Sequence, residues 1–272
     1  MPRYLLFLSL VFFGIGFFAV RFPGMPGASV VSLISTILIA LPTLVTFWRF
    51  LDAGVATLSL IALSILGFTI EITGVVTGFP YGEFYYDNAL GPKIAGTVPC
   101  TLPLSWVPLV IGAVAAARPR KDGGRLWRTL WVLTTVVLLV AIDGVLDPGA
   151  ARLGFWIWPE GGVYYGVPLS NYAGWLLSST LASAVVLILG DWWKDMIPLP
   201  SLLDSSIIAL AFWTAVAFST KLILPALLGS VLIAYLLVRR RRLSARAFCP
   251  AHKRAAPKGH APHRPPPPGA FR

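Results

Sequence analysis

The chain has 272 residues, of which 57% are hydrophobic and 12% charged, and its mean hydropathy is +0.78. This composition argues against a water-soluble globular protein and indicates an integral membrane protein. The formal net charge of +11 is typical of nucleic-acid-binding proteins, but ten of the 22 Lys and Arg residues lie after residue 238, where there is no acidic residue. The rest of the chain is nearly neutral, so nucleic acid is not expected as a partner.

Six apolar runs are long enough to cross a bilayer as helices, which takes about 20 residues. They cover residues 4–20, 28–48, 54–73, 101–117, 127–146 and 170–190. A further apolar stretch at 205–238 is too long for one ordinary span, and Lys221 and Pro225 lie near its middle. We therefore expect it to form two spans that are short or tilted.

Basic residues predict which loops face the cytoplasm. The loop between the fourth and fifth runs contains five of them, Arg118, Arg120, Lys121, Arg125 and Arg128. The positive-inside rule places this loop, the N-terminus and the basic run 239–242 in the cytoplasm, which requires an even number of spans. The sequence thus predicts an all-α, polytopic membrane helix bundle of about eight spans in the cell (cytoplasmic) membrane. Both termini are then inside, and 74–100 and 147–169 lie on the opposite side.

Two regions of different character follow from these patterns. Residues 1–238 are expected to form the membrane-embedded domain, and 239–272 a disordered, basic, Pro-rich tail attracted to anionic lipid. All three His residues lie in the tail, so acid and base chemistry within the membrane depends on Asp, Glu, Tyr or Lys. Cys100 and Cys249 are far apart and indicate no metal or redox pair.

Glu71 lies within the third apolar run, where an ionisable group costs roughly 3 kcal/mol at full depth. Gly67, Gly74 and Gly78 share its helical face. Because glycine lets another helix approach closely, this face is predicted to point into the bundle.

Asp143 and Asp147 repeat this pattern one turn apart at the end of the fifth run, where Pro148 is expected to end the helix. With Glu71 they bring three carboxyl groups to one end of the bundle. Capping of helix ends, or ion pairs with Lys93 or Arg152, would be a structural explanation for each acid taken alone.

Aromatic and acidic residues alternate in the two segments that join these helices. The first is "TGFPYGEFYYDNALGPKIAG" at 77–96, which contains Glu83, and the second lies within 147–169. An interfacial aromatic belt would explain rings scattered over both membrane surfaces. Clustering in two segments beside acids instead favours a site for a large apolar substrate and a transient cation. The Gly and Pro content of 77–96 predicts a compact lid.

Two long stretches resemble a known family. They are "EITGVVTGFPYGEFYYDNALGPKIAGTVPCTLPLSW" at 71–106 and "DGVLDPGAARLGFWIWPEGGVYYGVPLSNYAGWLLSS" at 143–179. They are similar to the carotenoid biosynthesis proteins, which include carotenoid hydratases of the CruF type and bisanhydrobacterioruberin hydratases. The resemblance implies a hydro-lyase that hydrates the terminal double bond of an acyclic carotenoid to a tertiary alcohol. It also implies a polyene substrate in the bilayer, with membrane lipids and other enzymes of the pathway as candidate partners.

Residue chemistry suggests the roles. Hydrating an alkene needs an acid to protonate carbon, groups that stabilise the cation, and a base for the attacking water. No metal or organic cofactor is required. The candidate catalytic residues are Glu71, Asp143, Asp147 and Glu83. The candidate substrate-binding residues are Tyr81, Tyr85, Tyr86, Trp106, Trp156, Tyr164, Tyr165, Asn171 and Trp175.

Other functions fit part of this pattern. Cyclisation or isomerisation of a carotenoid or prenyl lipid begins with the same protonation and differs in excluding water. A lipid transporter or binding protein would use buried acids for proton coupling, although no inverted repeat is evident. Lys221 suggests a retinal-binding lysine, but the sequence around it does not resemble a rhodopsin.

Overall fold

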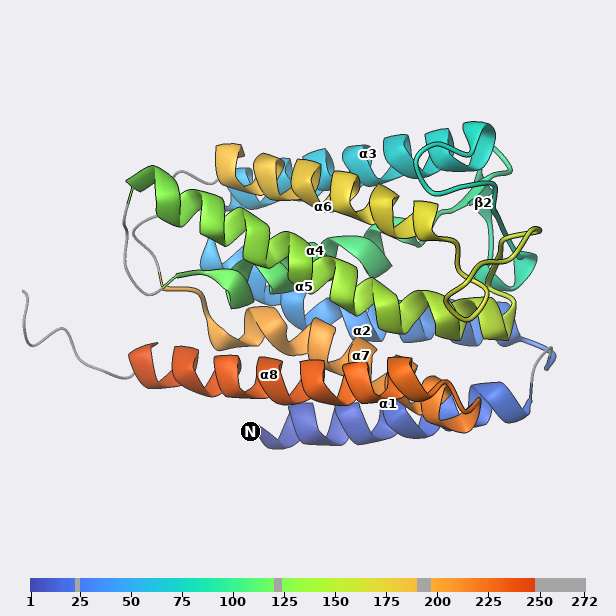
Figure 1. Ribbon diagram of the computed structural model, residues 1–272. Helices are drawn as coiled ribbons and strands as arrows, with labels where there is room; N and C mark the ends of the chain where they lie inside the picture. The colour runs from blue at the N-terminus through green and yellow to red at the C-terminus, as the bar shows by residue number, and fades with distance from the viewer. Residues whose placement is uncertain (23–24, 120–123, 190–196, 248–272) are drawn as a thin grey trace, which may run out of the picture.

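The computed structural model describes residues 1–22, 25–119, 124–189 and 197–247. Within these residues the chain forms a bundle of long helices with short strands at one end (Figure 1). The α-helices are α1 (Arg3–Arg21), α2 (Ala28–Phe50), α3 (Ala53–Thr77), α4 (Leu102–Ala117), α5 (Gly124–Leu153), α6 (Leu169–Leu189), α7 (Asp204–Ser219) and α8 (Ile223–Ala247). Short 3₁₀ helices η1 (Asn88–Leu90) and η3 (Pro200–Leu203) and strands β1 (Tyr85–Tyr86), β2 (Lys93–Ile94), β3 (Val98–Pro99) and β4 (Trp156–Ile157) complete the fold.

The predicted all-α, multi-span bundle is confirmed. In the described residues seven helical segments are long and apolar enough to cross a membrane, and α4 is a shorter apolar helix. Most residues of α4 and α7 are buried, so these two helices form the centre of the bundle. The outer helices α1, α2 and α3 expose many large apolar side chains, as expected where a protein meets lipid.

The start of α1 and the end of α8 lie at the same end of the bundle, and the strands lie at the other (Figure 1). This arrangement agrees with an even number of spans. Which end faces the cytoplasm stays a prediction from the charges of the loops.

Pro148 does not end the fifth span, as the sequence analysis expected. Helix α5 continues through it to Leu153. Proline removes the backbone N–H that would bond to the carbonyl four residues earlier, which here is the carbonyl of Gly144. The hydroxyl of Tyr164 donates a hydrogen bond to that oxygen at 3.2 Å. Pro148 is therefore tolerated inside the helix, because the Tyr164 side chain replaces the missing backbone donor.

The predicted division of 205–238 into two helices is confirmed. Helix α7 ends at Ser219 and α8 begins at Ile223, with Lys221 in a left-handed conformation (φ 60°) between them. Only α7 is short, because α8 contains 25 residues and runs on to Ala247. The domain boundary drawn at residue 238 thus falls inside α8, and 248–272 lie outside the described residues.

Two arginines of the basic run have partners inside the bundle. Arg240 Nε lies 2.6 Å from Oδ1 of Asp204, and Arg240 Nη2 lies 3.1 Å from Oδ2. The Tyr4 hydroxyl donates to Asp204 Oδ2 at 2.5 Å, and the Asp204 side chain is fully buried. Arg239 donates to the carbonyls of Ala116 and Arg118 at the end of α4. These contacts join α1, α4, α7 and α8 at the end away from the strands.

Replacing Arg240 by Leu should destabilise the protein by about 3–5 kcal/mol, because it leaves the Asp204 carboxylate buried without its cation. The measurement is the melting temperature of the purified protein in detergent. Arg241→Leu removes the same charge from an exposed neighbouring position and is the matched control. The double variant Asp204→Leu/Arg240→Leu should recover much of the loss. Equal melting temperatures for Arg240→Leu and Arg241→Leu would contradict a structural role for the ion pair.

Candidate active site

A short antiparallel ribbon joins the two aromatic segments that the sequence analysis singled out. Strand β1 pairs with β4, which places Tyr86 opposite Trp156, and the backbone N–H of Asp87 continues the pairing by donating to Phe155 O at 2.9 Å. The first segment also contains β2, which pairs with β3 just after it to form a hairpin. Residues 77–96 thus form a compact structure, and residues some seventy positions apart become neighbours.

Three carboxyl groups line one cavity beneath this ribbon. Glu71 comes from α3, and Asp143 and Asp147 come from successive turns of α5. Their residues are 8%, 1% and 4% exposed, respectively. The convergence expected from helical spacing is therefore observed.

The ribbon supplies a hydrogen-bond donor to two of the three acids. The Tyr86 hydroxyl donates to Glu71 Oε2 at 2.7 Å, and Trp156 Nε1 donates to Asp147 Oδ1 at 3.0 Å. Burial, and after it the charge of Glu71, raises the pKa of Tyr86 well above its ordinary value, so the phenol keeps its proton. The centroids of the Tyr86 and Trp156 rings are 5.9 Å apart. Pairing of the strands thus fixes both donors together.

Asn171, in the first turn of α6, connects Asp143 to Asp147. Its Nδ2 donates to Asp143 Oδ2 at 3.2 Å and makes a short hydrogen bond to Asp147 Oδ2. The second oxygen of Asp143 is buried and has no hydrogen-bond partner among the described residues. Asp143 Oδ1 is therefore the one oxygen of the Asp143–Asp147 pair that receives no donor from the described residues.

Glycines near Glu71 make room for aromatic rings. Gly67 lies against the Trp106 ring of α4, so a helix does approach there as predicted. Gly74 instead faces Tyr81, whose ring is enclosed between Gly74 of α3 and Gly174 of α6. A Cβ atom at either glycine would collide with that ring, which is why Tyr81 can be 3% exposed beside the acids.

The charged side chains that line this cavity are all acidic. Among the described residues, no Lys or Arg forms an ion pair with Glu71, Asp143 or Asp147. Several negative charges close together in an apolar environment repel one another and lack solvation. The arrangement therefore favours at least one protonated carboxyl group in the resting protein.

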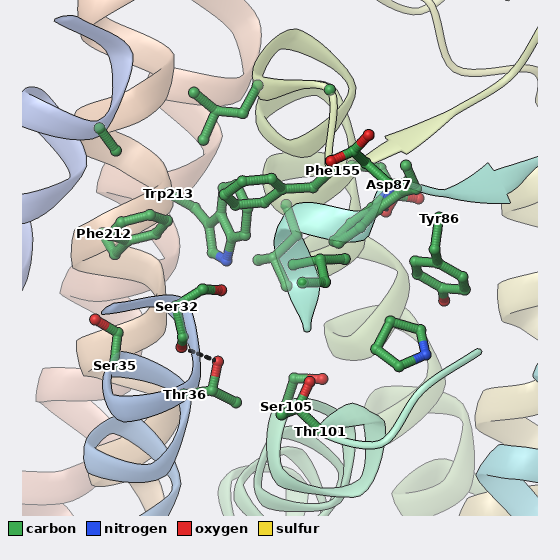
Figure 2. A pocket seen from close by; sticks show the side chains of 18 of the residues that line it. Ser32, Ser35, Thr36, Tyr86, Asp87, Thr101, Ser105, Phe155, Phe212 and Trp213 are labelled. Atoms are coloured by element: carbon green, nitrogen blue, oxygen red, sulfur yellow. Dashed lines mark hydrogen bonds between the residues drawn. The ribbon is translucent and has the colours of Figure 1, made fainter. Parts of the chain in front are cut away.

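The cavity has a volume of about 780 Å³ and a mainly apolar wall that includes many aromatic rings (Figure 2). Trp213 of α7 is central to it, with its ring centroid 6.1 Å from that of Trp156, 6.2 Å from that of Phe155 and 4.9 Å from that of Phe212. Trp213 and Phe212 were not among the predicted site residues, because they lie in an apolar helix with no acid nearby in sequence. Their only signal was a pair of adjacent large rings.

The predicted site residues divide into two groups. Those that line the cavity are Glu71, Asp143, Asp147, Tyr81, Tyr86, Trp106, Trp156, Asn171 and Trp175. Those that do not are Glu83, Tyr85, Tyr164 and Tyr165.

Local geometry explains the second group. Tyr85 and Tyr86 are consecutive in a strand and point to opposite faces, and Tyr85 is 49% exposed. Glu83 is exposed in the turn after α3. Tyr164 donates to the Gly144 carbonyl, and the Tyr165 hydroxyl accepts a hydrogen bond from the backbone N–H of Leu224 at 3.4 Å. These four residues therefore lie outside the wall of the cavity.

These features define the class as a multi-pass membrane protein with a buried group of carboxyls in an aromatic cavity. The family described as "Carotenoid biosynthesis protein" matches residues 27–236, and the chain belongs to this family. It is also 37% identical over 212 residues to the bisanhydrobacterioruberin hydratase of Haloarcula japonica. This match covers 74% of this chain and 70% of the hydratase. No solved structure matches the chain. The match begins after α1, so the site acids fall within it.

Proposed function

We propose that the protein is a carotenoid hydratase, which adds water across the terminal double bond of an acyclic carotenoid end group to give a tertiary alcohol. Membership of the carotenoid biosynthesis family and similarity to a named hydratase support this activity. The observation that carries it is the group of three buried carboxyls that have no cation partner among the described residues and lie in an apolar, ring-lined cavity of about 780 Å³.

In this mechanism Asp143 is the acid. Its Oδ1 is buried and has no hydrogen-bond partner among the described residues, whereas both oxygens of Asp147 accept hydrogen bonds. Donors stabilise a carboxylate, so Asp147 is the better anion and Asp143 the better proton carrier. Asp143 gives its proton to the less substituted alkene carbon, and the π electrons form the new C–H bond. A tertiary cation remains on the carbon that bears two methyl groups.

Aromatic faces stabilise this cation. Trp156, Trp213 and Phe155 lie together on the cavity wall, and each ring face attracts a cation by about 0.5–2 kcal/mol. The carboxylate of Asp147, which the Trp156 indole holds in place, adds a negative charge on the same side. The cavity thus favours the intermediate over the neutral alkene.

Water completes the reaction. Its oxygen attacks the cation, and Asp147 takes the released proton as general base. Asp147 and Asp143 share the Asn171 amide, so a proton gained by one acid is close to the other, and its return to Asp143 restores the starting state. Alkene and water give the alcohol with no oxidant or reductant. Glu71, which accepts a hydrogen bond from Tyr86, is a third carboxyl group near Asp143 and Asp147.

The setting of this activity follows from its substrate. A polyene is soluble in the bilayer, and the helices described above suit a multi-pass protein of the cell membrane. Other enzymes that act on the same lipid are candidate partners, because substrate and product both remain in the membrane.

Expression in a bacterium that makes an acyclic carotenoid tests the activity. The pigment should gain the mass of one water at an acyclic end, and water labelled with oxygen-18 should place the label in the hydroxyl group. An empty vector is the control. A product of unchanged mass with a new ring would instead establish a cyclase, and unchanged pigment would overturn the proposal.

Asp143→Asn should lower hydration by about two orders of magnitude or more, because an amide has no acidic proton to give. Asp147→Asn should do the same through loss of the base, and Glu71→Gln tests the third acid. Glu160→Gln, at an exposed position outside the cavity, is the control and should keep near-normal turnover. Pigment conversion is measured against the amount of folded protein. Near-normal turnover of Asp143→Asn would remove it from the acid role.

A further inference from the structure

The cavity extends beyond the acids, between the first two helices. On α1 and the residue that follows it the wall consists of Ile15, Phe18, Ala19 and Phe22, and on α2 it includes Ala28, Val31, Ser32, Ser35, Thr36 and Ile39. Both sets repeat every three or four residues, so each is one face of its helix. The α2 set spans roughly 16 Å of helix at about 1.5 Å per residue. The cavity is therefore elongated and continues away from the carboxyl groups.

Helices α1 and α2 are consecutive in sequence but scarcely contact each other. Helix α1 packs along α7, whereas α2 packs against α4, α7 and η3. Ala209, Phe212 and Trp213 of α7 line the cavity between them. The first two helices thus form two walls of a gap, and α7 forms its floor.

This gap opens on the lipid side of the bundle. Phe18, Phe22 and Val31 line the cavity and are 60%, 55% and 57% exposed. Exposed apolar side chains on a membrane-spanning helix face hydrocarbon rather than water. An apolar molecule in the bilayer would meet the gap directly.

Resting on the hydratase activity proposed above, we propose that the gap between α1 and α2 is a lateral channel for the polyene. Through it the acyclic end reaches the acids, and within it the rest of the chain lies during the reaction. An extended carotenoid is about as long as the hydrocarbon core is thick, about 30 Å. A cavity that extends roughly 16 Å along α2 holds only part of it. The remainder projects into lipid.

Small side chains keep the channel wide. Ser32, Ser35 and Thr36 of α2 lie across the cavity from Phe212, Trp213 and Phe155 (Figure 2). The Thr36 hydroxyl donates to the Ser32 carbonyl at 2.8 Å, so its proton is already used within the helix. A large residue at position 32 would narrow the passage from the α2 side, whereas the three acids come from α3 and α5.

The test is Ser32→Trp, with Ile34→Trp as its matched control on the same helix. Ile34 is 50% exposed and does not line the cavity. Each variant receives a full-length acyclic carotenoid and a short acyclic isoprenoid with the same end group. Ser32→Trp should lower hydration of the long substrate at least about tenfold and that of the short one less than about twofold. Ile34→Trp should convert both as the wild type does.

Wild-type conversion of the long substrate by Ser32→Trp would overturn the channel, as would an equal loss for both substrates. A second measurement does not depend on hydration. A photoreactive amino acid at position 32 should cross-link to the carotenoid bound in the purified protein, and one at position 34 should not. If the wild type hydrates neither substrate, the proposed activity fails, and this cross-linking alone decides the channel. Equal cross-linking at both positions would contradict it.

Discussion

Burial of three carboxyl groups in a membrane bundle is the constraint on which the rest of this structure depends. A buried acid needs hydrogen-bond donors, and the backbone N–H groups within a helix are already bonded to its own carbonyls, so the donors must come from side chains such as Asn171 or from other segments. The β1–β4 ribbon supplies them, because Tyr86 reaches Glu71 and Trp156 reaches Asp147 from paired positions. The two short strands thus have a structural role in this helical protein, because their pairing fixes the Tyr86 and Trp156 donors next to Glu71 and Asp147.

Buried carboxyl groups at the two ends of the bundle have different partners. At one end Asp204 is neutralised by Arg240 and bonded to Tyr4, which joins three helices and leaves the carboxylate little reactivity. At the other end Asp143 has an unpartnered oxygen and no cation partner among the described residues. The contrast separates an acid that stabilises the fold from acids available for chemistry.

The helices and the position of the acids could be predicted from sequence, because long apolar runs and residues at helical spacing are local signals. Glu71, Asp143 and Asp147 were found in this way. What the sequence could not show was long-range pairing. Only the register of β1 with β4 separates Tyr86 from Tyr85, and only the fold brings Trp213 to the cavity. Arg240 was assigned to a tail because a basic run is the ordinary signal of a cytoplasmic end, and Pro148 was expected to end a helix because its substitute donor, Tyr164, lies in another segment.

The central claim is that Asp143 holds a proton while Asp147 is the anion that faces it. Infrared spectroscopy of the purified protein at neutral pH measures this directly, through the carbonyl stretching band of a protonated carboxyl group. The account predicts a band in the wild type that shifts in heavy water and loses the Asp143 component in Asp143→Asn, but is unchanged in Glu160→Gln. Absence of the band from the wild type, or an unchanged band in Asp143→Asn, would contradict it.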